Sequence, residues 1–97
     1  VLKFNAPSTA NKYRDIAVAM GVKNTEDMSI EQARQACIEA VEKLSVDVGI
    51  PQKLTQLGVK EEDLQFLSES AFVDACTPGN PRDVSVEAIK EIYKSIM

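Results

Sequence analysis

The stretch that decides the fold is residues 29–50, SIEQARQACIEAVEKLSVDVGI. Its apolar residues recur every three or four positions, as on one face of an amphipathic helix: Ile30, Ala33, Cys37, Ala40, Val41, Leu44 and Val48. Ser29 and Gln32 have the spacing of a capping box. Gly49 can take the left-handed turn that ends a helix, and Pro51 cannot extend it. The pattern predicts a helix of about 19 residues, roughly 28 Å long, against which the other elements pack.

One helix is expected before this stretch and one after it. The first follows a turn at residues 5–9 and ends at Gly21. Residues 50–58 predict a short helix of about two turns, with Pro51 in its first turn and Gly58 as its stop. No segment alternates with the period of two that is typical of a half-buried strand.

The carboxyl-terminal part predicts two more helices. One follows the acidic turn at residues 60–63 and runs to about Cys76, and the last begins at a Ser85 cap. Outside residues 29–50, the apolar residues expected to be buried are Tyr13, Ile16, Ala17, Met20, Leu54, Leu57, Leu64, Leu67, Ala71, Ala75, Val86, Ile89, Ile92, Tyr93 and Ile96. Five helices without a sheet predict an all-α fold, an irregular bundle within one domain, residues 1–97.

The amino-acid composition limits the kinds of partner that this chain can bind. The 97 residues are 44% hydrophobic, which suits one domain with one core. The net charge is −4, and the 11 basic residues form no run, which argues against nucleic acid and anionic membranes as partners. No apolar run approaches the ~20 residues that span a bilayer, and no signal peptide is recognisable. These features predict a cytoplasmic protein.

The chain contains two cysteines and no histidine. The cysteine spacing matches neither a metal knuckle nor a redox pair, and Cys37 falls on the apolar stripe, where a buried core residue is expected. Without imidazole there is no Ser-His or Cys-His pair, and a transition-metal site would need carboxylates and thiolates alone.

The most specific motif is residues 74–82, DACTPGNPR. Pro78 and Gly79 suit a type II turn, with Gly79 left-handed, and Asn80 is pushed into an extended conformation by the proline after it. Such a rigid loop can line a pocket, but the same residues also suit a simple tight corner between helices. Cys76 is expected at the carboxyl end of a helix, where the partial negative charge argues against an activated nucleophile.

Four segments in this order carry a family resemblance: residues 1–5 (VLKFN), 12–17 (KYRDIA) followed by 20–22 (MGV), 47–51 (DVGIP), and 74–77 (DACT) with 79–82 (GNPR). With them the chain resembles the carboxyl-terminal helical region of the iron-containing (group III) alcohol dehydrogenases, particularly their lactaldehyde and propanediol oxidoreductases. The resemblance implies an all-α fold, the C-terminal part of the α-domain shared with dehydroquinate synthase-like proteins.

For the intact enzyme, the resemblance implies a Rossmann-type domain that binds NAD or NADP. It also implies a helical domain that holds one divalent metal, iron or zinc, through an aspartate and three histidines. None of these ligands is present here, and the last histidine of the family pattern would precede Leu2. The implied reaction is hydride transfer between the nicotinamide and a primary alcohol or aldehyde, in a homo-oligomeric enzyme. The chain itself would contain no catalytic, cofactor-binding or metal-binding residue.

The implied partners are the metal-binding helices and the Rossmann-type domain, and an apolar face is expected where those helices would sit. The resemblance implies that Cys76 and Thr77 line the substrate pocket, while Gly79, Asn80, Pro81 and Arg82 hold the corner. Arg82 is expected to cap a helix or to form a salt bridge.

The uncapped apolar start suggests a truncation, whether natural, engineered or proteolytic. It consists of Val1, Leu2 and Phe4. The alternative function is a stand-alone helical interaction module without catalytic activity, in which these three side chains form the docking surface. Catalysis by the 97 residues alone has the least support, because the usual groups for acid-base or cofactor chemistry are missing.

Overall fold

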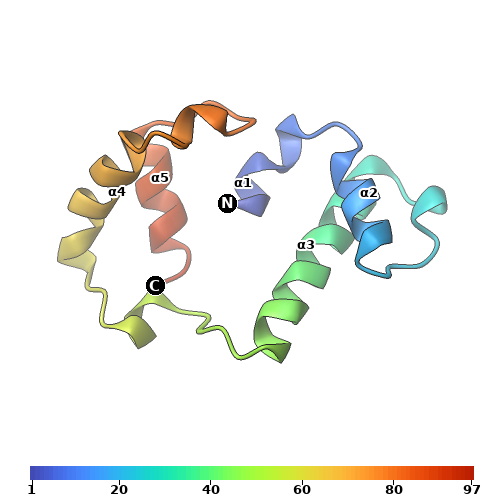
Figure 1. The fold of residues 1–97 in the computed structure, drawn as a ribbon, viewed down its shortest axis with the longest axis horizontal. Coiled ribbons are helices and arrows are strands. Elements are labelled where there is room, and N and C mark those ends of the chain that lie inside the picture. The colour runs from blue at the N-terminus through green and yellow to red at the C-terminus, as the bar shows by residue number, and fades with distance from the viewer. The chain divides into compact units, whose positions relative to one another are not determined.

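Five α-helices make up the computed structural model, which describes all 97 residues (Figure 1). They are α1 (Leu2–Asn5), α2 (Lys12–Ala19), α3 (Ile30–Asp47), α4 (Leu64–Phe72) and α5 (Val86–Lys94). The connections contain short 3₁₀ turns and there is no strand, so the predicted all-α fold is confirmed. Contacts divide the chain into two compact units, Val1–Ile50 and Pro51–Met97. The single domain expected from the sequence stays a prediction.

Helix α3 has the ends that its sequence predicts. Ser29 Oγ accepts a hydrogen bond from the Gln32 amide at 3.1 Å, and Gln32 Oε1 accepts one from the Ser29 amide at 2.8 Å, which completes the capping box. At the other end Gly49 has φ +80°, and the Ile50 amide donates to the Ser45 carbonyl at 2.9 Å. Local hydrogen bonds therefore determine where this 18-residue helix begins and ends.

Helix α2 packs on α3 and forms the core of the first unit. The buried cluster consists of Tyr13, Ala17, Cys37 and Ile38. Leu2 packs against this cluster from α1, and the Tyr13 hydroxyl donates to the Leu2 carbonyl at 2.9 Å. The sequence predicted the burial of Tyr13, Ala17 and Cys37 but not Ile38, nor a helix at residues 2–5. The apolar start is thus partly used in the packing of this unit.

The apolar stripe of α3 is fully buried at only two of its positions. Ala33 and Cys37 are fully buried, whereas Leu44 is 49% and Val48 63% exposed. With eight residues α2 is about 12 Å long, and it covers less than half of α3, which is about 27 Å long. The burial predicted for Leu44 and Val48 is therefore wrong within this chain, whereas Ala40 and Val41 are partly buried. The same holds for Ile16, Met20 and Ile30, which are exposed.

In the second unit, α4 packs on α5. Leu64 and Ser68 of α4 are fully buried, and the Ser68 hydroxyl donates to the Leu64 carbonyl at 2.6 Å. The predicted Ser85 cap of α5 is present, because Ser85 Oγ accepts a hydrogen bond from the Ala88 amide. Of the predicted core residues in this unit, Leu57, Ala75 and Ile96 are exposed.

The segment 50–58 does not form the predicted two-turn helix. A single 3₁₀ turn, Leu54–Leu57, takes its place, and Pro51 lies outside it. Gln56 Oε1 accepts hydrogen bonds from the Gln52 and Lys53 amides at 2.9 and 3.0 Å, so a side chain of the turn gives partners to the two amides that precede it. The predicted stop is confirmed, since Gly58 has φ +84°. No helix of the chain has the length and apolarity needed to cross a membrane.

Candidate functional site

The predicted site, residues 74–82, lies between α4 and α5 in the second unit. Helix α4 ends at Phe72 and not near Cys76 as predicted. Asp74 Oδ1 accepts a hydrogen bond from the Cys76 amide at 2.8 Å, and this side-chain bond competes with a further helical turn. Cys76 is exposed and does not sit at the carboxyl end of the helix. The helix-dipole argument against a reactive thiol therefore does not apply.

The corner after Cys76 is a 3₁₀ turn, Thr77–Gly79, and not the predicted type II turn. Gly79 is not among the glycines with positive φ, so it lacks the left-handed conformation expected from the sequence. The Gly79 amide donates to the Cys76 carbonyl and the Asn80 amide to the Thr77 carbonyl, at 3.1 and 3.0 Å. Asn80 is extended, with φ −66° and ψ 137°, as predicted for a residue before proline.

Two side chains of this corner donate hydrogen bonds to backbone carbonyls. Thr77 Oγ1 donates to the Ala71 carbonyl at 2.5 Å, which gives a partner to one of the last carbonyls of α4. Asn80 Nδ2 donates to the Arg82 carbonyl at 2.6 Å. Thr77, predicted as pocket lining, and Asn80, predicted as a corner residue, thus both make hydrogen bonds to the backbone of this region.

A cavity of about 270 Å³ opens at this corner. Its lining includes three of the predicted residues, Thr77, Asn80 and Arg82. Cys76, Gly79 and Pro81 are not part of it. The remaining lining residues are Phe72, Pro78, Asp83 and Val84.

Phe72 and Asp83 were missed by the sequence analysis. Phe72 looked like a flank of the apolar helix pattern, and an acidic residue in a loop has no periodicity that distinguishes it. One available signal was the position of Asp83 next to Arg82. The roles of Arg82 as a cap or salt-bridge partner, and of Cys76 as pocket lining, stay predictions.

The groups that line this cavity can bind a small molecule. The Thr77 hydroxyl has its proton engaged with the Ala71 carbonyl, so its lone pairs are what it can offer to a ligand. The Asp83 carboxylate and the Arg82 guanidinium add charged groups to the lining, while Phe72 and Val84 add apolar surface. Such a lining can orient a small molecule with one polar and one apolar end.

The residues of this chain do not fit the divalent-metal site that the family resemblance implies. No three side chains among His, Cys, Asp and Glu lie close enough together to hold a metal ion, and the sequence has no histidine. Burial raises the pKa of the Cys37 thiol, which keeps it neutral and suits a core residue. Burial also raises the pKa of Tyr13, with a further contribution from Cys37 and an opposing one from Arg34.

Comparisons with known proteins agree on one family. The sequence profile of the Fe-containing alcohol dehydrogenase family, C-terminal, matches residues 1–97. Lactaldehyde reductase of Escherichia coli (strain K12) is 52% identical over 93 residues, which cover 96% of this chain and 24% of that protein. NAD-dependent methanol dehydrogenase of Bacillus methanolicus is 35% identical over 97 residues, 100% of this chain and 25% of that protein.

Among solved structures, a crystal structure of 1,3-propanediol oxidoreductase matches with a TM-score of 0.93 at 35% identity. The match covers 99% of this chain and 25% of that one. The chain thus spans about a quarter of the length of the relatives it matches. From the profile match over its whole length, the chain belongs to the Fe-containing alcohol dehydrogenase family and corresponds to the family's C-terminal region.

Proposed function

We propose that these 97 residues act as the C-terminal helical part of an alcohol dehydrogenase that transfers hydride between a nicotinamide, NAD or NADP, and a primary alcohol or aldehyde. One observation carries this proposal: the chain aligns over 96% of its length, at 52% identity, with a quarter of a lactaldehyde reductase. The names of the relatives include a reductase of a small aldehyde and an NAD-dependent dehydrogenase of methanol. A small oxygenated substrate fits a cavity that is lined by both polar and apolar side chains.

Within that enzyme, the chain contributes packing and part of the substrate pocket. The nicotinamide and the divalent metal, iron or zinc, are bound by the rest of the enzyme. Cys76 presents an exposed thiol beside the corner, and Thr77 holds the corner to α4. Thr77 lines the cavity at this corner, and Cys76, which lies just outside that cavity here, completes the wall against which the substrate lies in the intact enzyme. Residues 1–97 alone are inactive. The proposal includes a cytoplasmic, homo-oligomeric enzyme.

A chimera tests the proposal. Residues 1–97 replace the matching quarter of E. coli lactaldehyde reductase, and the metal-loaded chimera is assayed for NADH-dependent reduction of lactaldehyde. The chimera is expected to be active, whereas the isolated 97 residues and the reductase without this quarter are expected to be inactive. A chimera that folds and binds metal and nicotinamide, but turns over none of the tested aldehydes, would contradict the proposal. Activity of the isolated chain would contradict the assignment of the chemistry to the rest of the enzyme.

A further inference from the structure

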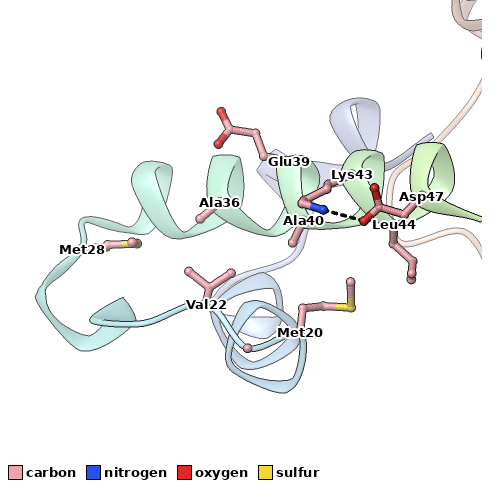
Figure 2. A pocket seen from close by; sticks show the side chains of 10 residues that line it. Met20, Val22, Met28, Ala36, Glu39, Ala40, Lys43, Leu44 and Asp47 are labelled. Carbon is pink, nitrogen blue, oxygen red and sulfur yellow. Dashed lines mark hydrogen bonds and ion pairs between the residues drawn. The ribbon is translucent and has the colours of Figure 1, made fainter.

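An open groove lies in the first unit, between the carboxyl end of α2 and one face of α3 (Figure 2). Its volume is about 660 Å³. Most of its lining is apolar: Met20, Val22, Met28, Ala36, Ala40 and Leu44. Met20 and Leu44 are large apolar side chains that remain exposed. None of these residues belongs to the corner at residues 74–82, so this groove needs a separate explanation.

The shape of the groove suits a helix better than a compact ligand. Ala36 and Ala40 are one turn apart on α3, and their small side chains leave room for a second helix to approach closely. Met20 and Met28 flank this floor, and their flexible side chains can adapt to a partner. A second hollow shares Met28, Ala36 and Glu39 and continues toward Glu31. Together the two hollows follow α3 for about 24 Å, which is several helical turns.

The charges along the groove indicate which partner fits. Lys43 and Asp47 neutralise one another at 2.5 Å. Glu39 accepts a hydrogen bond from the Gln35 side chain at 2.9 Å, and no cation pairs with it. Glu39 lines both hollows, so it lies near the middle of the combined groove. A second copy of this chain docked symmetrically about that point would place two Glu39 carboxylates close together, which is unfavourable.

We propose that this groove seats an amphipathic helix from the part of the same enzyme that lies outside residues 1–97, with apolar residues facing Ala36 and Ala40 and a lysine or arginine facing Glu39. The inference rests on the proposed function. It draws on the length of the relatives, of which this chain covers about a quarter, and on the match to the family's C-terminal region. The larger remainder of those relatives therefore precedes the matched region and can supply the helix.

The connection of that remainder favours the first unit. In the relatives, the preceding chain joins at the position of α1, and α1 is fixed to this unit by two contacts. The Tyr13 hydroxyl binds the Leu2 carbonyl, and Lys3 pairs with Glu42 of α3 at 2.8 Å. A helix that precedes α1 is therefore held at a high effective concentration next to α3.

Thiol labelling of Ala40→Cys, in a Cys76→Ser background, tests the inference without relying on activity. The maleimide labelling rate is measured in the isolated chain and in the chimera with lactaldehyde reductase. Labelling is expected to be at least about tenfold slower in the chimera, because the seated helix covers position 40. Glu26→Cys, in an exposed turn, is the control and is expected to react at the same rate in both proteins.

Equal labelling rates of Ala40→Cys in the two proteins would overturn the inference. Slow, concentration-dependent labelling in the isolated chain would also overturn it, in favour of a second copy. A second variant checks the charge: Glu39→Lys is expected to lower the Tm of the chimera by more than that of the isolated chain, where it costs only the Gln35 hydrogen bond and adds a like charge one turn from Lys43. An active chimera with an accessible groove would refute only this inference, whereas an inactive chimera with a protected groove would refute only the proposed function.

Discussion

Replacing Thr77 by valine is expected to loosen the corner between α4 and α5 with almost no change in side-chain shape. The substitution removes the 2.5 Å hydrogen bond from Oγ1 to the Ala71 carbonyl. That carbonyl keeps the Asp74 amide as a donor, but at 3.3 Å, so it is not left without a partner. The expected cost is therefore the net value of one hydrogen bond, about 1 kcal/mol. For a unit that spans only Pro51–Met97, whose unfolding entropy is about 0.1 kcal/mol/K, that cost lowers the Tm by roughly 10 °C.

The assay must report on the second unit alone, and the composition of the chain makes this feasible. The sequence has two tyrosines and no tryptophan, with Tyr13 in the first unit and Tyr93 in α5. In a Tyr13→Phe background, tyrosine fluorescence therefore follows the unfolding of the second unit. Thermal melts are compared for the background protein, Thr77→Val and Thr77→Ser. The serine variant keeps the hydroxyl and loses only a methyl group.

The hydroxyl is expected to account for most of the effect, so the valine variant should melt well below the serine variant. If Thr77→Val melts at the same temperature as the background protein while Thr77→Ser melts lower, the methyl group matters and the hydrogen bond does not. That result would refute the argument that Thr77 holds the corner to the end of α4. It would also remove the support for Thr77 as the residue that positions the pocket wall.

Four further outcomes are expected. Ser29→Ala removes the cap of α3 and lowers the free energy of unfolding by about 1 kcal/mol in urea melts, while Ser29→Asp, which can still cap, stays near the wild type. Leu64→Ala removes a fully buried side chain and costs about 3–5 kcal/mol, so a variant whose α4 amides keep their protection from hydrogen exchange would contradict this packing. Burial raises the pKa of Cys37 above its ordinary value of 9.0, so stability is constant below that pH and falls as the pH rises toward the folded-state pKa of the thiol. Tyr13, whose pKa is raised from 10.0, adds a second fall. Cys37→Ala should show only the tyrosine part, made smaller because the contribution of Cys37 to the Tyr13 pKa is lost. Cys76→Ala in the chimera is expected to change kcat or KM for the alcohol, and unchanged values for every alcohol tested would rule out a pocket role.

The parts of the fold that the sequence predicted depend on local hydrogen bonds. Ser29 with Gln32, Gly49 and the Ser85 cap each act within a few residues, and the structure has the corresponding helix ends where they were expected. Helix α1 was not predicted, because the contacts that fix it come from Tyr13 and from α3, far along the chain. Periodicity within four residues could not indicate such contacts.

The errors fall where two local conformations compete closely. Asp74 can continue a helix or bind the Cys76 amide with its carboxylate, and the second option ends α4 early. Gly79 tolerates both the left-handed and the right-handed conformation, so the sequence alone could not distinguish a type II turn from the observed 3₁₀ turn. For the site, the motif identified Thr77, Asn80 and Arg82, whereas the cavity they share depends on how α4 ends.

The exposed half of α3 links the fold to the proposed function. Leu44 and Val48 continue the stripe that buries Ala33 and Cys37, yet both remain largely exposed here. A fully buried residue of this kind contributes about 1.5–3 kcal/mol, so much of that contribution is absent in the isolated chain. Small domains are stable by only about 5–15 kcal/mol, and the missing burial is a sizeable share of that. A stripe longer than the surface that this chain can cover is what we expect of a helix whose second half packs against the rest of a dehydrogenase.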